Sequence, residues 1–510
     1  MQLIISASLI LAIVVWGIVA PAHVGAVFDT ALALITRNFG WFYLWVVLGL
    51  VVLALLLAFS RYGNLKLGAE DDEPEFSIGS WFAMLFAAGM GIGLVFWGVA
   101  EPISHYGTPP PGIAPNTPEA ANAAMRYSFF HWGLHPWAVY SVVALAMAFF
   151  QFRRGGSGLV STAVEALPWR VFRHIGPAVN VLAVIATAFG VAASLGMGAL
   201  QINSGLNALL GLPVGQTSQL GIIAVTTVLF LVSAVSGVTK GIKWLSSFNL
   251  VVAALLALAV FVLGPTVAII DTLTSALGNY LSEFVRMSLR MTPFRESNWV
   301  GSWTIFYWAW WVSWSPFVGL FIARVSRGRT VREFILGTVI APTIAAFIWF
   351  SVFGGTALNL EIMQHVPVAE AVKADVSTAL FAMFDQLPLG TLLSGVATIL
   401  VAVFFVTSGD SAVLVLSMMS SGGHPDPSAR VKIGWGLLVA GIASSLLVVG
   451  GLKSVQTATI VFALPFTVVI LLMAVSLCRG LREDYLEEQR RERVLRRRLR
   501  EIVEHPPSAS

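Results

Sequence analysis

The feature that most restricts the fold of this chain is a succession of long apolar runs separated by short polar segments. Each run has about 20 residues, the length that an α-helix needs to cross a hydrocarbon layer of roughly 30 Å. Only 11% of the 510 residues are charged, whereas about a quarter of a soluble globular protein is charged. The runs lie at 2–20, 40–59, 79–100, 128–150, 177–209, 217–236, 244–267, 299–323, 332–356, 390–420, 429–450 and 453–478. We therefore expect an all-α integral membrane protein with twelve transmembrane helices.

The distribution of basic residues predicts how these spans are oriented. Of the 30 Lys and Arg residues, 23 follow even-numbered spans, the C-terminal tail included, and 7 lie on the other side. Because basic loops stay in the cytoplasm, we expect both termini there. The first run has no basic segment before it and no clear cleavage site before Pro21, so we interpret it as a retained span. The basic tail and loops indicate contact with anionic lipids and no nucleic-acid partner.

Two segments differ from the apolar runs. Residues 268–297 alternate charged and apolar positions at helical spacing, which predicts an amphipathic helix on the outer membrane face. Residues 479–510 hold nine arginines and seven acids, with acid and arginine four residues apart, and predict a cytoplasmic helix. That tail is either a solvated segment that fixes the topology or a regulatory helix that senses lipid or ionic conditions.

The amphipathic segment divides the chain into blocks. Two N-terminal helices occupy 1–60, and two blocks of five spans occupy 79–267 and 299–478. Since five is odd, the second block must be inverted in the membrane relative to the first. Paired interruptions in corresponding spans are the best sequence indication of a transporter's binding site.

The leading span of each block carries residues that interrupt helices. Gly89, Gly91 and Gly93 alternate in the first block, and Pro316 with Gly319 stands in the second. Glycine costs roughly 1 kcal/mol per position in a helix, so we expect the first span to unwind and expose amides and carbonyls. The alternative is that the glycines only permit close helix packing. We likewise expect Pro316 to break the second span.

Aromatic side chains in two spans predict a site for an organic cation. Trp137 and Tyr140 share a helical face, and Trp132 joins them if Pro136 distorts the turn between. The other span supplies four tryptophans, Trp308, Trp310, Trp311 and Trp314. Together these rings could surround a quaternary ammonium group, each face contributing about 0.5–2 kcal/mol. The alternative for the first group is an interfacial aromatic belt.

The polar side chains near these spans are few. No carboxylate lies obviously in the aromatic cage. Glu101 and Asp410 are functional candidates because they are ionisable residues in apolar runs, and the alternative is that each caps a local helix or holds a loop. His131 and His135 stand four apart, but two ligands without a third make a weak metal site, and we interpret them as structural.

Adjacent hydroxyls in a later span suggest a cation site. Thr407 and Ser408 offer neutral oxygens of the kind that sodium accepts beside backbone carbonyls. Their alternative role is hydrogen bonding to a preceding carbonyl of the same helix.

Three segments carry a resemblance to a known family. They are FWGVAEPISHY, FHWGLHPWAVY and WAWWVSWSPFVGLFIARVSRGRT. With the preceding glycine stretch, they resemble the betaine/choline/carnitine transporter family, and the similarity covers nearly the whole chain. The resemblance implies a leucine-transporter-like core of two inverted five-helix repeats, spans 3–7 and 8–12, behind two extra helices. It also implies a multi-pass protein of a bacterial-type cytoplasmic membrane, commonly a homotrimer.

The resemblance further implies the site residues. The ammonium box would comprise Trp132, Trp137, Tyr140 and Trp311, flanked by Trp310 and Trp314, with Met90, Gly91 and Gly93 lining the unwound stretch. A sodium ion would bind the carbonyls of Ala87, Met90 and Phe404 and the hydroxyls of Thr407 and Ser408. A second family sodium site near Phe317 is not placed, because span 5 offers only Thr187 and Ser194.

Substrate choice in the family turns on the position of Gly93, where choline carriers typically have an aspartate. A neutral pocket favours a zwitterion that brings its own carboxylate, so we expect sodium-coupled uptake of glycine betaine or a related compatible solute by alternating access. The tail could make uptake respond to osmotic conditions. Alternatives are a proton-coupled or sodium-independent choline or carnitine carrier and, from other classes, a membrane-embedded enzyme or a channel. No cofactor besides the coupling ion is expected.

Overall fold

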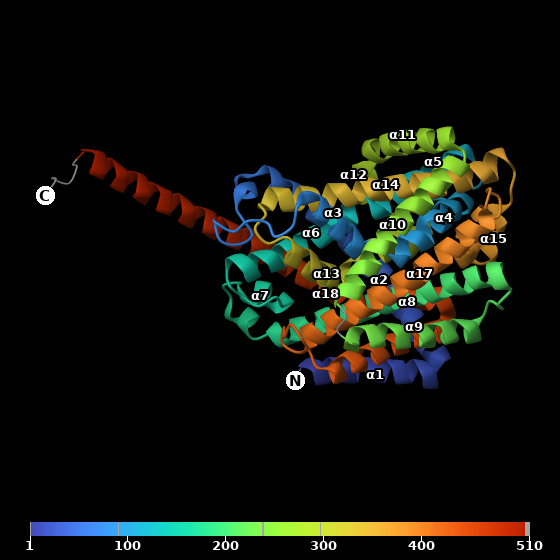
Figure 1. Ribbon diagram of the computed structural model, residues 1–510, viewed down its shortest axis with the longest axis horizontal. Coiled ribbons are helices and arrows are strands. Elements are labelled where there is room, and N and C mark those ends of the chain that lie inside the picture. Colours follow the sequence, from blue (N-terminus) through green and yellow to red (C-terminus); the bar gives the residue numbers. More distant parts are fainter. Residues whose placement is uncertain (1, 90, 237–238, 296, 505–510) are drawn as a thin grey trace.

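The chain folds into a bundle of helices. The computed structural model describes residues 2–89, 91–236, 239–295 and 297–504. Within these ranges the backbone forms helices and loops. Lys66 and Thr330 also form an isolated antiparallel bridge. The long helices lie side by side, and both ends of the chain lie at the same end of the bundle, where the last helix projects from it (Figure 1). The prediction of an all-α membrane protein is confirmed.

The helices that form the bundle cover the predicted spans. Their bounds are α1 (Gln2–Val19), α2 (Pro21–Phe59), α3 (Ile78–Gly89), α4 (Ile92–Gly107), α5 (Pro118–Trp132), α6 (Leu134–Ala148), α8 (Gly176–Leu210), α9 (Gln216–Ser236), α10 (Thr239–Leu263), α13 (Phe306–Val325), α14 (Val331–Met363), α17 (Gly390–Ser420) and α18 (Ala429–Glu504). The connecting elements are η1 (Arg61–Asn64), η2 (Phe149–Arg153), α7 (Val160–Glu165), η3 (Arg170–Arg173), α11 (Thr266–Ser282), α12 (Phe284–Ser288), η4 (Gly301–Ile305), α15 (Val368–Ala374), η5 (Val376–Thr378) and α16 (Ala379–Phe384).

The number of spans differs with how interruptions are counted. In the described part of the chain, ten helices are long and apolar enough to cross a membrane. The third predicted span is divided between α3 and α4, and α18 contains the last two spans and the tail. Within α18, Gly450 and Gly451 have non-helical dihedrals, and Gly451 has a φ of 59°, which only glycine adopts readily. The count of twelve and the inverted arrangement of spans 3–7 and 8–12 stay predictions.

The segment predicted as an amphipathic linker, 268–297, contains most of α11 and all of α12. Gly264 and Pro265 end α10 before it, and α11 then packs against α14 and α5 at the edge of the bundle (Figure 1). Tyr280 is buried against the bundle while Leu281 is 61% exposed. The helix therefore has one face toward the protein and one apolar face directed outward, as a helix in a membrane interface does.

The predicted break at Pro316 is wrong, because α13 runs without interruption from Phe306 to Val325. Proline deprives the carbonyl four residues earlier of its helical hydrogen bond, and here that carbonyl belongs to Val312. The Ser315 hydroxyl donates a hydrogen bond to the Val312 carbonyl oxygen over 2.7 Å and replaces the lost N–H. The helix tolerates its proline for this reason.

The aromatic spans lie in the centre of the bundle. Helix α13 packs against α6, α8 and α18, and α6 packs against α14. Helix α8 is buried along most of its length and contacts α17 and α18. Predicted site residues from four separate parts of the sequence thereby come to one region.

Candidate functional site

The glycine-rich stretch does interrupt the helix. Helix α3 ends at Gly89 and α4 begins at Ile92, with Gly91 extended between them at φ −139° and ψ −144°. A Cβ built on Gly91 would have the Ser408 hydroxyl oxygen of α17 as its neighbour at 3.8 Å. The unwound backbone therefore faces α17. Met90 lies outside the described residues.

Span 4 is also interrupted, at a different residue from the one expected. Helix α5 ends at Trp132 and α6 begins at Leu134, so the break is at Gly133 and not at Pro136. Pro136 occupies the first turn of α6, where a helix needs no N–H from it. A Cβ on Gly133 would meet the Phe129 carbonyl oxygen at 2.5 Å, so a larger residue does not fit. The Leu134 N–H donates to the Tyr280 hydroxyl at 3.4 Å.

The break brings the four predicted box residues into ring contact. The centroids of Trp137 and Tyr140 are 5.6 Å apart at an interplanar angle of 77°, and those of Tyr140 and Trp311 are 6.0 Å apart at 83°. Trp311 and Trp132 complete the series at 4.9 Å and 77°. All four side chains are buried. Successive rings thus meet edge to face at nearly right angles. That these rings enclose an onium group, as π faces around a cation would, stays a prediction.

The two flanking tryptophans lie differently. Trp310 stacks on Trp311 with centroids 4.9 Å apart at 17°, and its edge approaches Gly93. A Cβ on Gly93 would lie 2.4 Å from Cη2 of Trp310 and 3.2 Å from Cη2 of Trp132. Trp314 is half-buried and donates its Nε1 hydrogen to the Gly190 carbonyl oxygen over 2.9 Å. The position of Gly93 is thus closed to a side chain unless an indole moves.

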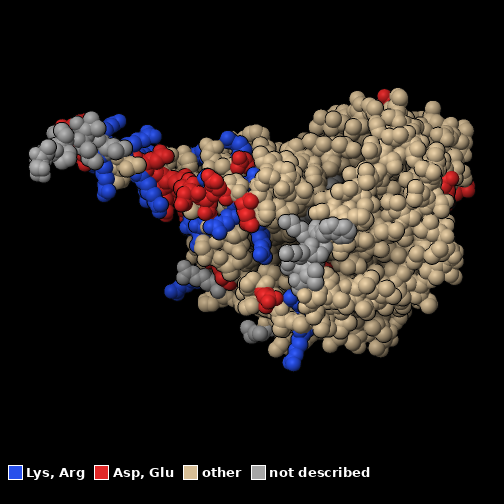
Figure 2. Space-filling view, viewed as in Figure 1, with Lys and Arg blue, Asp and Glu red and all other residues tan. Residues whose placement is uncertain are grey.

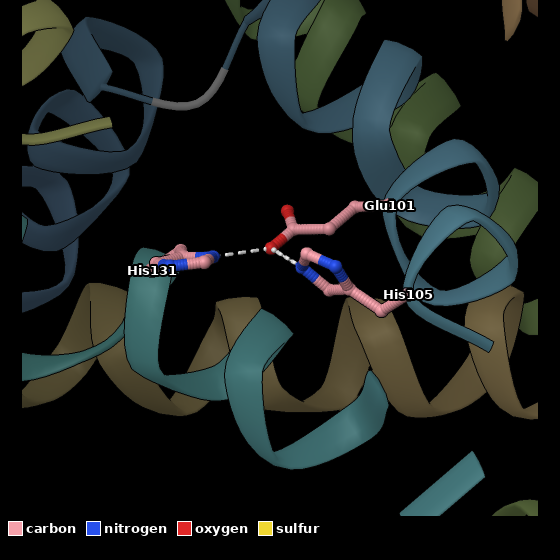
Figure 3. A group of neighbouring side chains, drawn as sticks. All are labelled: Glu101, His105 and His131. Atoms are coloured by element: carbon pink, nitrogen blue, oxygen red, sulfur yellow. Dashed lines mark hydrogen bonds and ion pairs between the residues drawn. The ribbon is translucent and has the colours of Figure 1, made fainter. Parts of the chain in front are cut away.

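A fully buried acid stands behind the box. Glu101 lies between His105 of its own helix and His131 of α5, and both histidines approach the same carboxylate oxygen (Figure 3). Oε1 is 2.6 Å from His131 Nδ1 and 3.2 Å from His105 Nε2. Oε2 accepts hydrogen bonds from Trp132 Nε1 at 2.8 Å and from the Tyr307 hydroxyl at 2.5 Å. The carboxylate therefore contacts the N–H edge of the Trp132 indole from behind the box.

The acid and the two histidines could be considered as a metal site, since their ligand atoms lie within 4.8 Å of one another. Two ligands of one tetrahedral zinc ion, each about 2.05 Å from the metal, would stand roughly 3.3 Å apart. The 2.6 Å between Glu101 Oε1 and His131 Nδ1 is instead a hydrogen-bond distance. His135 belongs elsewhere, because its Nε2 is 2.9 Å from the Ser288 hydroxyl and its ring stacks on Trp308. We interpret the cluster as a hydrogen-bond network, with the histidines in structural roles.

The predicted sodium ligands gather near the unwound stretch. Ala87 lies in the last turn of α3, while Phe404 and Thr407 are buried in α17 near Ser408. The Thr407 hydroxyl donates to the Val403 carbonyl oxygen over 2.9 Å. That is the helical bond considered as its alternative role. The same oxygen accepts a hydrogen bond from Asn249 Nδ2 at 3.4 Å, which leaves one of its two lone pairs for a cation. The two roles are compatible.

The remaining polar candidates, Asp410, Thr187 and Ser194, lie in other parts of the bundle. Asp410 accepts a hydrogen bond from the Ser233 hydroxyl of α9, which ties α17 to α9. On α8, Ser194 is buried and Thr187 is buried with no partner for its Oγ1 among the described residues. The structure thus leaves the second family sodium site without a defined set of ligands.

The C-terminal tail is helical, as expected, and is ion-paired at its root. Arg153, at the end of η2, contacts Asp484 at 2.6 Å, Glu488 at 2.7 Å and Glu70 at 2.8 Å. A neighbouring pair joins Arg327 to Asp72 at 3.0 Å, and the guanidinium's hydrogen bond holds the pKa of this carboxyl below its usual range. Figure 2 shows charged residues concentrated at this end of the face in view, around the projecting helix. We call the Arg153 pairs with Glu70, Asp484 and Glu488 the tail clasp.

Comparisons with known proteins identify the family. A family model for betaine/carnitine/choline transporters matches residues 2–486. The chain belongs to this transporter family. It is similar to the glycine betaine transporter OpuD of Bacillus subtilis (strain 168), with 50% identity over 95% of this chain and 94% of that protein. It is also similar to the ectoine/hydroxyectoine transporter of Virgibacillus pantothenticus, with 46% identity over 94% of this chain and 95% of that protein.

A third relative is the probable glycine betaine transporter of Desulfitobacterium hafniense (strain Y51), 44% identical over 95% of this chain and 97% of that protein. Among solved structures, the chain is similar to a Na+-coupled sialic acid symporter in a substrate-bound outward-open state. The identity is 13%, over 84% of this chain and 85% of that chain, with a TM-score of 0.49. The family resemblance is confirmed: the protein is a multi-pass membrane transporter, not an enzyme.

Sequence reasoning missed the role of Glu101 as a contact of the box. Glu101 and Trp132 are separated by 31 residues, and their hydrogen bond depends on how α4 packs against α5. The available signal was that Glu101 is an acid in an apolar run, where an ionisable residue needs a partner. Trp132 and His131 stood in the neighbouring span as such partners.

Proposed function

We propose that this transporter imports glycine betaine, or a related zwitterionic onium solute, together with sodium. The observation that carries the proposal is the box of perpendicular rings formed by Trp132, Trp137, Tyr140 and Trp311. A methylated ammonium group has no N–H to donate, so aromatic faces are the groups that recognise it best. Relatives named for glycine betaine and for ectoine support the solute class.

The neutral surroundings of Gly93 support a zwitterion over a simple cation. The carboxylate of Glu101 is directed at the indole N–H of Trp132, on the edge of the ring and not on its face. A cationic solute would therefore enter the box without a direct counter-charge, whereas a betaine carries its own. We propose that the betaine carboxylate lies toward the unwound backbone between α3 and α4, where helix ends offer free N–H groups.

Sodium coupling is supported by the position of the break. The Gly91 backbone lies against the Ser408 hydroxyl. The Thr407 oxygen accepts a hydrogen bond from Asn249 and retains a second lone pair for an ion. We propose that carbonyls of Ala87, Met90 and Phe404 complete this ion site. Binding at the break would then depend on the same backbone that receives the solute carboxylate, which couples the two ligands. Each positive charge that enters gains about 2.3 kcal/mol per 100 mV of membrane potential.

The orientation and regulation of the transporter follow from its charges. We propose that both termini lie in the cytoplasm of a bacterial-type cytoplasmic membrane, with the basic tail near anionic lipids. The tail clasp would weaken as cytoplasmic ionic strength rises, because salt screens charges over a length of roughly 8–10 Å. The clasp would thereby make uptake respond to osmotic conditions. We also propose a homotrimer, which light scattering of the detergent-solubilised protein would test.

The decisive experiment is uptake of labelled glycine betaine into proteoliposomes with an imposed sodium gradient. Accumulation above the outside concentration, abolished when potassium replaces sodium, is the expected result. Full uptake without sodium would instead support the sodium-independent alternative, and uptake driven by a proton gradient would support proton coupling. Competition by choline, carnitine, ectoine and dimethylsulfoniopropionate would order the solutes. Equilibration without accumulation would indicate a channel.

A further inference from the structure

The Glu101 carboxylate is surrounded by four hydrogen-bond donors. The indole of Trp132 can only donate, and an ionised carboxylate can only accept. We assign the histidine tautomers from their partners. His131 then donates from Nδ1 to Glu101 and accepts at Nε2 from the Thr304 hydroxyl at 3.0 Å. His105 donates from Nε2 and keeps a bare Nδ1, which has no partner among the described residues. All four donors are then neutral, so the cluster retains the negative charge of Glu101.

This charge reaches the box through one bond. Trp132 donates to Oε2 over 2.8 Å, and its ring forms one wall of the box. A hydrogen bond to an anion is stronger than one between neutral groups. It also shifts electron density from the N–H into the indole ring, which makes the π face more negative. Since that face attracts cations electrostatically, the bond strengthens the wall of the box.

The same cluster holds a second wall. Trp311 donates its Nε1 hydrogen to the backbone carbonyl of His131 at 3.0 Å, and His131 is the partner of Glu101. Of the two indoles that meet at 4.9 Å, one is therefore bonded to Glu101 of α4 and the other to the backbone of His131, the partner of Glu101 on α5. Loss of the Glu101 carboxylate would release the Trp132 indole, whereas the Trp311 bond, which runs to the His131 backbone, would remain.

We propose that Glu101 is a positioning and polarising residue of the onium box: it fixes the Trp132 indole and transmits negative charge to its face without contacting the solute. The proposal rests on the proposed function and deepens it. It explains how a box without an exposed counter-charge can hold an onium group while still accepting a solute that carries its own carboxylate.

A double-mutant cycle tests the proposal through the KM of glycine betaine uptake. Glu101→Gln and Trp132→Phe should each raise KM roughly tenfold, the scale of a lost charge-assisted hydrogen bond. Because both remove the same bond, adding Glu101→Gln to Trp132→Phe should change KM by less than about twofold. If the two effects multiply, Glu101 acts independently of the Trp132 N–H and the proposal is wrong.

A matched control uses another buried indole next to the same helix. Trp349 donates its Nε1 hydrogen to the Leu94 carbonyl oxygen of α4 at 3.0 Å and does not contact the Glu101 carboxylate. Trp349→Phe and Glu101→Gln should therefore combine multiplicatively, whatever their separate sizes. Near-complete non-additivity in this pair as well would show a general loss of structure in α4 and would overturn the inference.

A second variant keeps the test valid if Glu101→Gln does not fold. Replacing Trp132 with 3-benzothienylalanine exchanges the indole N–H for sulfur and leaves the ring size and Glu101 unchanged. KM should again rise roughly tenfold, and an unchanged KM refutes the proposal. The unaltered protein is assayed first: if it imports no glycine betaine, the proposed function fails, whereas normal import with additive variants rejects only the role of Glu101.

Discussion

Replacing Gly93 with alanine should weaken solute binding through steric contact with the box. The added Cβ would stand 2.4 Å from Cη2 and 3.1 Å from Cζ2 of Trp310, distances at which something must move. Trp310 cannot rotate away easily, because it is buried and stacked on Trp311 at 17° and on Phe306 at 17°. Overpacking of this kind costs about 1–3 kcal/mol. If a shifted indole must return when the solute binds, a cost of about 2 kcal/mol raises KM roughly 30-fold.

The assay is the concentration dependence of glycine betaine uptake in proteoliposomes, with the amount of inserted protein and its melting temperature measured in parallel. Gly107→Ala is the matched control, since Gly107 ends the same helix and a Cβ there meets no atom within 4 Å. The control should keep both KM and melting temperature. A wild-type KM for Gly93→Ala, in a protein that is equally stable, would refute the steric reasoning. Gly93→Asp should additionally raise the ratio of choline to glycine betaine uptake above that of Gly93→Ala, because it introduces a counter-charge.

Three further variants test other parts of the proposed transport cycle. Trp311→Ala should abolish measurable uptake by removing a wall of the box, whereas Trp41→Ala, on the outside of α2 and 52% exposed, should not; uptake by the Trp311 variant would exclude the box. Thr407→Val should raise the sodium concentration for half-maximal uptake at least several-fold, with the solute KM at saturating sodium little changed; an unaltered sodium dependence would remove Thr407 from the ion site. Arg153→Gln should shift the osmotic activation profile of uptake, whereas Arg498→Gln, farther along the tail, should leave it in place; identical profiles for both variants and the unaltered protein would argue against the tail clasp as a sensor.

The sequence predicted the helices well because membrane helices are specified locally. An apolar run of about 20 residues must form its backbone hydrogen bonds within itself, whatever its neighbours are. The predicted spans 177–209, 217–236 and 390–420 accordingly differ by a single residue at most from the ends of α8, α9 and α17. The start of α2 was missed, because its first half follows Pro21 with polar residues mixed among apolar ones. Residue types alone do not reveal that such a stretch is helical.

The interruptions were predicted less well, since they depend on which group satisfies a freed carbonyl. Pro316 is accommodated because Ser315 lies beside it and donates to the carbonyl of Val312. Span 4 breaks at Gly133, where close approach of Phe347 and the Phe129 carbonyl leaves no room for a side chain. Contacts between neighbouring groups decide whether the helix continues at Pro316 and breaks at Gly133. Such contacts cannot be derived from a single sequence.

In the candidate site, too, the sequence predicted the residues but not the contacts between helices. Aromatic composition and family resemblance predicted which rings take part, and the structure brings Trp132, Trp137, Tyr140 and Trp311 into contact. The hydrogen bond between Glu101 and Trp132 joins two helices and was not predicted. Whether these rings bind the solute is the subject of the variants above.

The unbroken course of α13 has a mechanical consequence. Trp311 lies in the first third of this helix. The segment just beyond the end of the helix is bound to the α2–α3 loop by the Arg327 pair with Asp72 and by a hydrogen bond from Arg329 to the Phe76 carbonyl oxygen. From Trp311 to Val325 the helix extends about 21 Å at 1.5 Å per residue. A tilt of about 5° at the box would move the far end by roughly 2 Å over that length. A solute bound between the indoles would therefore tilt α13 as one rigid helix. This tilt would displace the α2–α3 loop, which leads into the interrupted helix α3.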